Sequence, residues 1–154
     1  MTDTQAAELI HLADEDSSVV VRVLGRLEPG VLLYHDLLRA EIIVESAFAK
    51  GELPVPLRRE DLDDWEQALE ALAAEQNILW MGYSDPNIKI EFDDDSSYLG
   101  ITVTDAAASA TSISIAVDPP DDWLRRHRAR LQLVRDTWPC ETIETSYGSV
   151  MWRT

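Results

Sequence analysis

The sequence predicts an α+β fold in which about six to eight antiparallel strands form a sheet that carries two main helices. Segments with a two-residue apolar period outnumber the helical segments, and several of them are joined by short turns. Short turns make neighbouring strands antiparallel. The helical segments follow groups of strands and do not alternate with single strands, which argues against a parallel sheet.

Three strands are expected first, over residues 9–12, 19–24 and 39–46. Acidic turn residues at 14–17 separate the first two. The third has the clearest alternation, with Ala40, Ile42 and Val44 on one face and charged residues on the other. This pattern is typical of a half-buried strand.

A fourth strand follows the turn at residues 50–51. Leu53, Val55 and Leu57 face inward, and Pro54 and Pro56 occupy the positions between them. Because proline cannot donate to a β ladder, we expect an edge strand.

The first helix is expected over about residues 60–75. Leu62, Trp65, Leu69 and Leu72 recur at the three-and-four spacing of a single apolar stripe. Carboxylates fill its first turn, where they favour the helix dipole.

Four further strands are expected over residues 78–83, 88–92, 99–103 and 113–117, again joined by short turns. The second helix is expected to start at Asp118-Pro119, a cap residue followed by proline, and to run to about residue 136.

A chain of 154 residues is long enough for one domain with one core. We therefore expect a single domain over 1–154, with its core at about 8–138 and a tail or hairpin at 141–154. Within that tail, residues 142–145 and 150–152 have β character. Trp65, Trp123 and Trp138 belong to the helix stripes and are expected in the core.

The charge is strongly negative and unevenly distributed. The formal net charge is −16, of which residues 1–118 carry −17 and residues 119–154 carry +1. Such a field favours a basic protein partner over nucleic acid or an anionic membrane. The arginines of the second helix spread around its polar face, so we expect them to pair with the acidic remainder or to make a dimer contact.

A cytoplasmic location is expected. The single cysteine, Cys140, excludes an internal disulfide, and the first residues lack a basic start and an apolar signal core. No apolar run reaches the roughly 18 residues that a membrane helix needs.

No pattern in the sequence indicates a metal, a cofactor or a nucleophile with its base. The consecutive carboxylates at 93–95 lack the alternate spacing of a calcium loop. His35-Asp36 is the one place where proton transfer is conceivable, His127 lies in an apolar helix stripe, and Cys140 has no activating neighbour. We therefore expect a binding protein without catalytic residues, cofactor or metal. The candidate partner-binding residues are exposed acids and two tryptophans that are expected as exposed anchors: Asp61, Asp64, Asp93, Asp94, Asp95, Trp80 and Trp152.

Two longer runs carry a family resemblance. Residues 40–46, followed by Phe48, Gly51 and Leu53, and then residues 60–72 resemble an uncharacterised actinobacterial domain-of-unknown-function family over roughly residues 8–138. The family usually has Ser-Pro where this chain has Arg58-Arg59, so the cap of the first helix must differ. The strand order is more distantly similar to immunity proteins of the WapI toxin type. Neither resemblance implies catalytic residues.

Together, these patterns favour a non-catalytic acidic binding module, immunity-like or inhibitory, that binds a basic protein. Two alternatives remain open: an enzyme or small-ligand-binding domain with a pocket between sheet and helices, and a DNA-mimic inhibitor. A homodimer is compatible with each of these functions.

Overall fold

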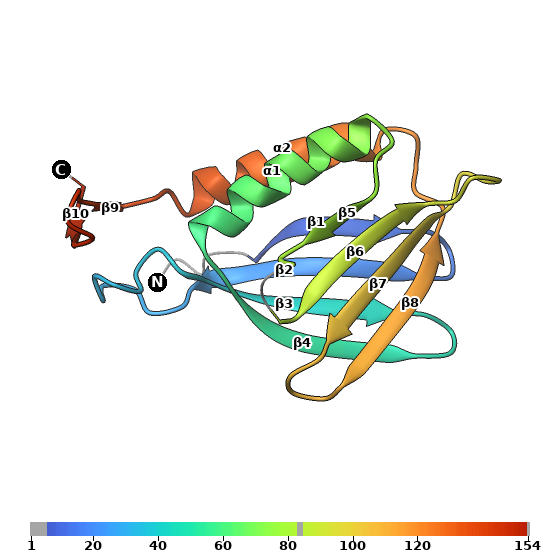
Figure 1. The fold of residues 1–154 in the computed structure, drawn as a ribbon, viewed down its shortest axis with the longest axis horizontal. Coiled ribbons are helices and arrows are strands. Elements are labelled where there is room, and N and C mark those ends of the chain that lie inside the picture. Colours follow the sequence, from blue (N-terminus) through green and yellow to red (C-terminus); the bar gives the residue numbers. More distant parts are fainter. Residues whose placement is uncertain (1–5, 83–84, 154) are drawn as a thin grey trace.

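The computed structural model of the protein describes residues 6–82 and 85–153. Two four-stranded antiparallel sheets lie beneath a pair of helices, and a two-stranded hairpin ends the chain (Figure 1). The expected α+β class, with about eight strands in the main sheets and two main helices, is confirmed. The division of these strands into two separate sheets was not predicted.

The N-terminal sheet has the strand order β1-β2-β3-β4. Its strands are β1 (Ala7–Ala13), β2 (Ser18–Arg26), β3 (Leu38–Glu45) and β4 (Lys50–Leu57). The alternation expected in β3 is confirmed, with Ala40, Ile42 and Val44 buried. Strand β4 is an edge strand, as its prolines predicted, and Pro54 and Pro56 are exposed opposite Glu41 and Arg39 of β3.

The C-terminal sheet has the order β5-β6-β7-β8. Its strands are β5 (Ile78–Trp80), β6 (Asn87–Phe92), β7 (Leu99–Asp105) and β8 (Thr111–Val117). Strand β5 is shorter than expected because Met81 has a left-handed backbone, with φ of 59°. The last residue of the expected strand, Tyr83, lies outside the described residues.

Helix α1 (Arg59–Ala73) buries the predicted stripe of Leu62, Trp65, Leu69 and Leu72. Arg58 is its N-cap residue, and the Asp61 carboxylate accepts a hydrogen bond of 2.8 Å from the Arg58 backbone N–H. This carboxylate therefore supplies the half of a capping box that reaches back to the N-cap residue.

Helix α2 (Trp123–Thr137) begins later than expected. The predicted start at Pro119 is wrong because Pro120 follows it, and the residue before a proline is disfavoured in the helical region. Asp118 is consequently part of a link between β8 and α2, and Asp122 is the N-cap residue.

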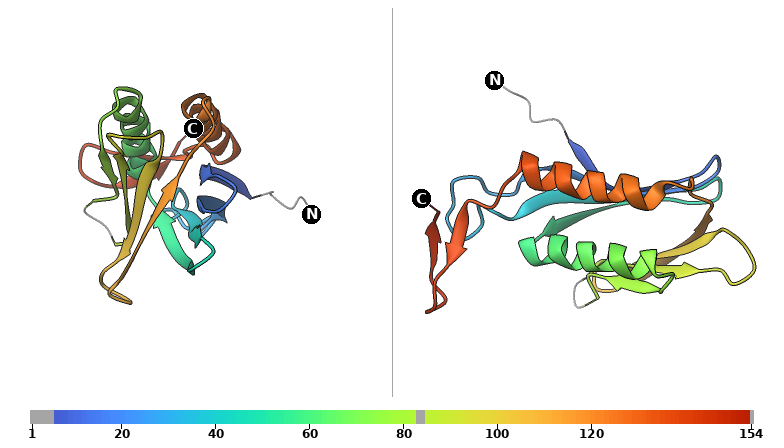
Figure 2. Two further views of the ribbon diagram at one scale, coloured as in Figure 1. Left: turned by 90° about the vertical axis from the view of Figure 1, so that its right-hand side faces the viewer. Right: turned by 90° about the horizontal axis from the view of Figure 1, so that it is seen from above.

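The helices close one side of the molecule (Figure 2). Helix α2 contacts β1, the outer strand of the N-terminal sheet, and α1 contacts both α2 and β5. Trp65 is buried between them, with ring centroids 5.3 Å from Trp80 and 6.4 Å from His127. Trp138 is also buried and Trp123 is partly buried, as expected for helix stripes.

The C-terminal hairpin consists of β9 (Thr142–Glu144) and β10 (Val150–Trp152), which confirms the predicted β character. It lies beside the β2–β3 loop, beyond the ends of the helices (Figure 1). Among the described residues, neither helix has the length and apolar character needed to cross a membrane.

Candidate functional site

Three loops that are distant in sequence meet at one end of the molecule. They are the β1–β2 turn (residues 14–17), the β6–β7 loop (93–98) and the β8–α2 link (118–122). The Asp118 backbone N–H donates to Asp14 Oδ2 at 2.9 Å, and Ser97 Oγ donates to Asp118 Oδ1 at 2.8 Å. These bonds tie the loops together. We call this region the acidic end.

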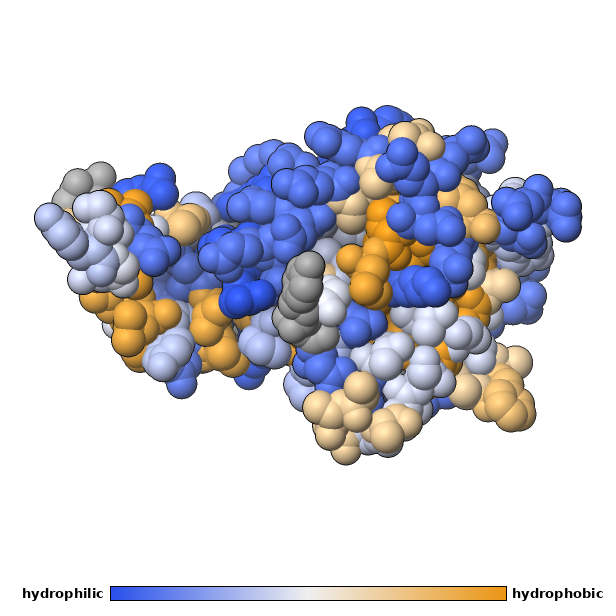
Figure 3. Space-filling view, viewed as in Figure 1, coloured by the Kyte–Doolittle hydropathy of each residue, from blue (hydrophilic) through white to orange (hydrophobic). Residues whose placement is uncertain are grey.

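The acidic end concentrates negative charge around a hollow. Its three loops contain no lysine or arginine and nine carboxylates, namely Asp14, Glu15, Asp16, Asp93, Asp94, Asp95, Asp118, Asp121 and Asp122. Acids of the β1–β2 turn and the link line the hollow together with exposed Tyr98 and Pro120. This end is hydrophilic in the space-filling view, where it lies at the right (Figure 3).

Local hydrogen bonds keep part of this charge ionised in acid. The backbone N–H of Asp118 lowers the pKa of Asp14, and the Ser96 hydroxyl lowers that of Asp93. The Arg126 guanidinium, 2.9 Å from Asp122, lowers the pKa of that carboxyl. These three carboxylates therefore keep their negative charge at a lower pH than an ordinary aspartate does.

Of the predicted binding residues, Asp93, Asp94 and Asp95 lie in the acidic end. Asp93 stabilises the β6–β7 loop, because its carboxylate accepts hydrogen bonds from the Asp95 backbone N–H at 3.1 Å and from Ser96 Oγ at 2.7 Å. Asp94 and Asp95 are exposed, and no hydrogen bond to their carboxylates occurs within the described residues.

The two predicted acids of α1 lie elsewhere and differ from each other. Asp61 is only 3% exposed and caps its own helix, so the expectation that it is exposed is wrong. Asp64 is exposed and lines a hollow against β5 with Gln67 and Leu79. The structure does not bring either residue to the acidic end.

The two tryptophans predicted as surface anchors also differ in exposure and in position. Trp80 is 1% exposed and its Nε1–H donates to the Asp61 carbonyl oxygen at 2.9 Å, so it is a core residue and not a surface anchor. Trp152 is 42% exposed, as expected. It lies on β10 at the opposite end of the molecule, with its ring 4.8 Å from that of His35.

Asp36 is a structural hub. Its carboxylate accepts hydrogen bonds from the Glu141 and Thr142 backbone N–H groups, the Thr142 hydroxyl, the Cys140 thiol and Arg26 Nη1. Burial opposes its ionisation, but these bonds, the Thr142 hydroxyl first, hold its pKa well below the usual range. A carboxylate that is ionised and fully occupied in this way is poorly suited to proton transfer.

Like Asp36, His35 joins the β2–β3 loop to the C-terminal segment. Its Nδ1 accepts from the Gly30 N–H at 2.8 Å, which places the proton of the neutral ring on Nε2, 3.2 Å from Glu141. The His35-Asp36 pair therefore fastens the C-terminal segment to the β2–β3 loop. Neighbouring Cys140 has a raised pKa, because of burial and its bond to Asp36, which disfavours the reactive thiolate.

The arginines of α2 pair partly within the protein, as expected. Arg135 lies 2.8 Å from Asp63 and 3.1 Å from Glu66 of α1, which joins the two helices. Arg125 and Arg126 both bond to Asp122.

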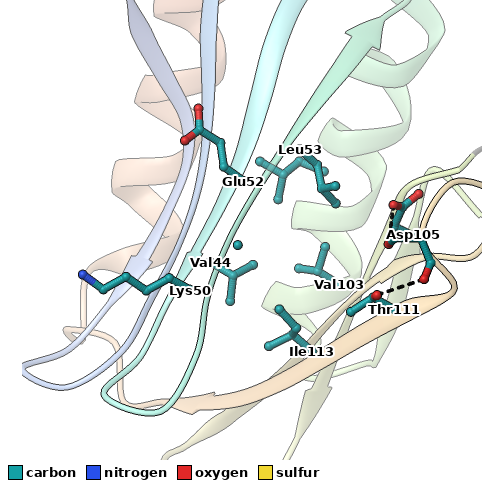
Figure 4. Close-up of a pocket in the computed structure, with 11 residues that line it drawn as sticks. Val44, Lys50, Glu52, Leu53, Val103, Asp105, Thr111 and Ile113 are labelled. Carbon is teal, nitrogen blue, oxygen red and sulfur yellow. Dashed lines mark hydrogen bonds between the residues drawn. The ribbon is translucent and has the colours of Figure 1, made fainter.

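A cavity of about 190 Å³ lies between β3 and β4 of one sheet and β7 and β8 of the other. Figure 4 shows Val44, Val103 and Ile113 pointing into it. Buried Asp105 lies at one side, and its Oδ2 accepts from Ser109 Oγ at 2.7 Å. This cavity lies between the two sheets, whereas the hollow that Asp64 lines lies between α1 and β5, where a pocket between sheet and helices was expected.

Sequence reasoning missed the acidic end as a unit. The acids at 14–16 and at 118 were visible only as turn and cap residues, and no local pattern indicated that they meet. Within the described residues, no three His, Cys, Asp or Glu side chains are arranged to hold a metal ion.

Comparison with known proteins gives a family assignment. No curated protein and no solved structure matches the chain. The model of DUF5959, a family of unknown function, matches residues 7–139. The match includes both sheets and both helices and ends before the C-terminal hairpin. The expected resemblance to a family of unknown function is therefore confirmed, and the chain belongs to the DUF5959 family.

Proposed function

We propose that this protein is a non-catalytic binding protein whose acidic end receives a basic segment of another protein. The observation that carries the proposal is the meeting of three loops with nine carboxylates at one end of the molecule, where Asp14, Glu15, Asp16 and Asp118 line a single hollow. An inhibitory, immunity-like role, in which the acidic end covers a basic surface of its partner, is the form of this function that we favour.

The distribution of the basic residues supports a partner from outside. Nine of the thirteen lysines and arginines already pair with carboxylates of the same chain. Within residues 6–82 and 85–153, most of the remaining charge therefore belongs to carboxylates without an ion pair. A basic partner would relieve the mutual repulsion of the acidic end and would be steered toward it over a distance of about one Debye length.

The chemistry of the hollow suits arginine or lysine in particular. Carboxylates from different loops can each accept a charge-assisted hydrogen bond from a guanidinium or an ammonium group. The exposed Tyr98 ring offers a face for a cation–π contact with the same groups.

The test begins with capture of a partner from the source lysate and its elution with rising salt. With the purified partner, association rates are then compared for the native protein, for Asp94→Asn/Asp95→Asn, and for Glu60→Gln/Asp64→Asn in the first half of α1. Both double variants remove two charges from exposed positions, so the net charge changes equally. Only the first pair lies in the acidic end.

We expect Asp94→Asn/Asp95→Asn to slow association more than the α1 control does, with a smaller effect on dissociation. Association should also slow with salt, because the Debye length falls from about 10 Å at 0.1 M to about 3 Å at 1 M. Equal effects of the two variants, or a complex that is indifferent to salt, would contradict the proposal.

A second candidate function, binding of a small apolar ligand, is favoured by the cavity between the sheets. Its volume of about 190 Å³ is below the roughly 300 Å³ at which ordinary ligand pockets begin, so the ligand would be small. If a ligand stays bound during purification, mass spectrometry should detect it among the small molecules released when the protein is denatured. Val44→Phe fills the cavity and should abolish this binding. Equal retention by the variant would contradict this function.

A further inference from the structure

Exposed apolar side chains gather at the end of the molecule opposite to the acidic end. Eight of the twelve large exposed apolar residues of the described chain lie in the β2–β3 loop and the C-terminal hairpin. They are Leu27, Val31, Leu33, Tyr34, Ile143, Tyr147, Met151 and Trp152. We call this region the apolar end, and Figure 3 shows hydrophobic atoms there, at the left.

The two segments of the apolar end are joined by polar contacts. Asp36 and His35 of the loop bond to Thr142 and Glu141 of the C-terminal segment, and Arg26 bridges both segments. Their apolar side chains are thereby held together but remain uncovered. Isolated two-stranded hairpins are marginally stable in water, so β9 and β10 would gain from a covering surface.

The charges at the two ends differ sharply. Residues 26–37 and 139–153, with Arg59 reaching toward Asp36, carry three basic and four acidic groups, a formal −1. The acidic end carries nine carboxylates and no basic residue in its three loops. A strongly basic partner is attracted to the acidic end, and the apolar end is left for a surface of low charge.

We propose that the protein forms a twofold symmetric homodimer through its apolar end. A second copy suits this end because contact there keeps both acidic ends at the far sides of the dimer, as the long axis of Figure 1 shows. Contact through the acidic ends of two chains of charge −16 would instead bring their most negative loops together. The dimer uses a different surface from the proposed partner site and does not depend on it.

The rim of the apolar end is self-complementary in charge. Arg153 and Glu144 lie on the hairpin, and neither forms an ion pair within the described residues. A twofold axis places the same surface on both sides of an interface. Arg153 can therefore face Glu144 of the partner subunit, and the reverse, around a centre of Leu33, Met151 and Trp152.

Sedimentation equilibrium of the full chain, from low-micromolar to submillimolar concentration, tests the proposal. We expect a monomer–dimer equilibrium that strengthens with salt, because salt screens the repulsion between two acidic copies while leaving apolar contact intact. This salt response is opposite in sign to that expected for a basic partner.

Two variants test whether the interface lies at the apolar end. Leu33→Asp introduces a charge at a residue that is 65% exposed, and Trp152→Ala removes the largest side chain of the apolar end. Each variant should raise the dimer dissociation constant by about thirtyfold or more. Phe48→Asp is the matched control, since Phe48 lies in the β3–β4 turn and is 99% exposed. It should leave dimerisation unchanged.

Because Leu33 is a loop residue on the surface, Leu33→Asp should keep the native unfolding midpoint, so a loss of dimer would not reflect unfolding. A native protein that stays monomeric at every concentration and salt would overturn the proposal. A dimer weakened as much by Phe48→Asp as by Leu33→Asp would overturn it as well.

Discussion

Acidification should destabilise the protein through His127. This residue is 1% exposed on α2, its Nδ1–H donates to the Trp123 carbonyl oxygen at 2.6 Å, and its Nε2 accepts from the His11 backbone N–H at 3.0 Å. The neutral ring thus satisfies a backbone donor on β1, the outer strand of its sheet. A protonated ring would carry a second N–H against that donor and lose the bond.

Burial is the main reason why the pKa of His127 falls from 6.5 to about 4, and the charges of Arg130 and His11 add to it. Between pH 6.5 and about pH 4, His127 is protonated in the unfolded chain but stays neutral in the native chain. The stabilisation is therefore fully present above pH 6.5 and is lost as the pH falls toward 4. The free energy of unfolding falls by about 3 kcal/mol when this loss is complete, and by about 2–3 kcal/mol at pH 4.5.

Urea unfolding at pH 7 and pH 4.5 measures this loss, with His127→Gln as the variant that cannot titrate. The native protein should lose about 2–3 kcal/mol more than His127→Gln over this interval. Carboxylates contribute equally to both proteins and cancel in the comparison. Equal losses in the two proteins would refute the assignment of a neutral, buried His127. In NMR spectra, its ring signals should stay unchanged until the pH approaches 4.

Three further changes have defined outcomes. Trp65→Ala should lower the free energy of unfolding by about 3–5 kcal/mol in urea melts, because the side chain is fully buried between the helices and β5; an unchanged midpoint would mean that α1 packs differently. Asp61→Ala should cost about 1 kcal/mol through the lost helix cap, whereas exposed Asp64→Ala should change the midpoint little, and similar losses would contradict the cap. Asp36→Asn should speed backbone hydrogen exchange in β9 and β10 more than in α1, because Asp36 bonds the C-terminal segment to the β2–β3 loop. An equal change in the hairpin and in α1 would show that Asp36 does not hold the hairpin. The native hub should itself weaken only in strong acid, because the lowered pKa of Asp36 keeps its contribution intact above the ordinary value of 3.8.

The periodicity of the chain determined most of the elements. Alternation in β3 and the apolar stripe of α1 predicted which side chains are buried, because each element exposes one face to solvent along its whole length. The prolines of β4 predicted an edge strand, since their missing N–H groups cannot serve a central strand. The start of α2 was mispredicted, although Pro120 provided local evidence against a helix at that point.

Other properties were decided only by tertiary structure. A short strand does not reveal whether its aromatic residue meets solvent or a helix, so the burial of Trp80 against Asp61 required the packing of β5 on α1. Asp61 lies four residues before Trp65 and so borders the apolar stripe of α1, but its role as a helix cap depends on the bond that it accepts from the Arg58 backbone N–H.

The two ends of the molecule depend on contacts across most of the chain. Asp14 meets Asp118, and Asp36 meets Thr142, over more than 100 residues of sequence. Composition determined that the protein is acidic, and turn chemistry determined where its loops lie. The gathering of acids at one end and apolar side chains at the other follows from sheet order and helix packing, because spacing in sequence encodes local periodicity and not which distant loops share an end of the fold.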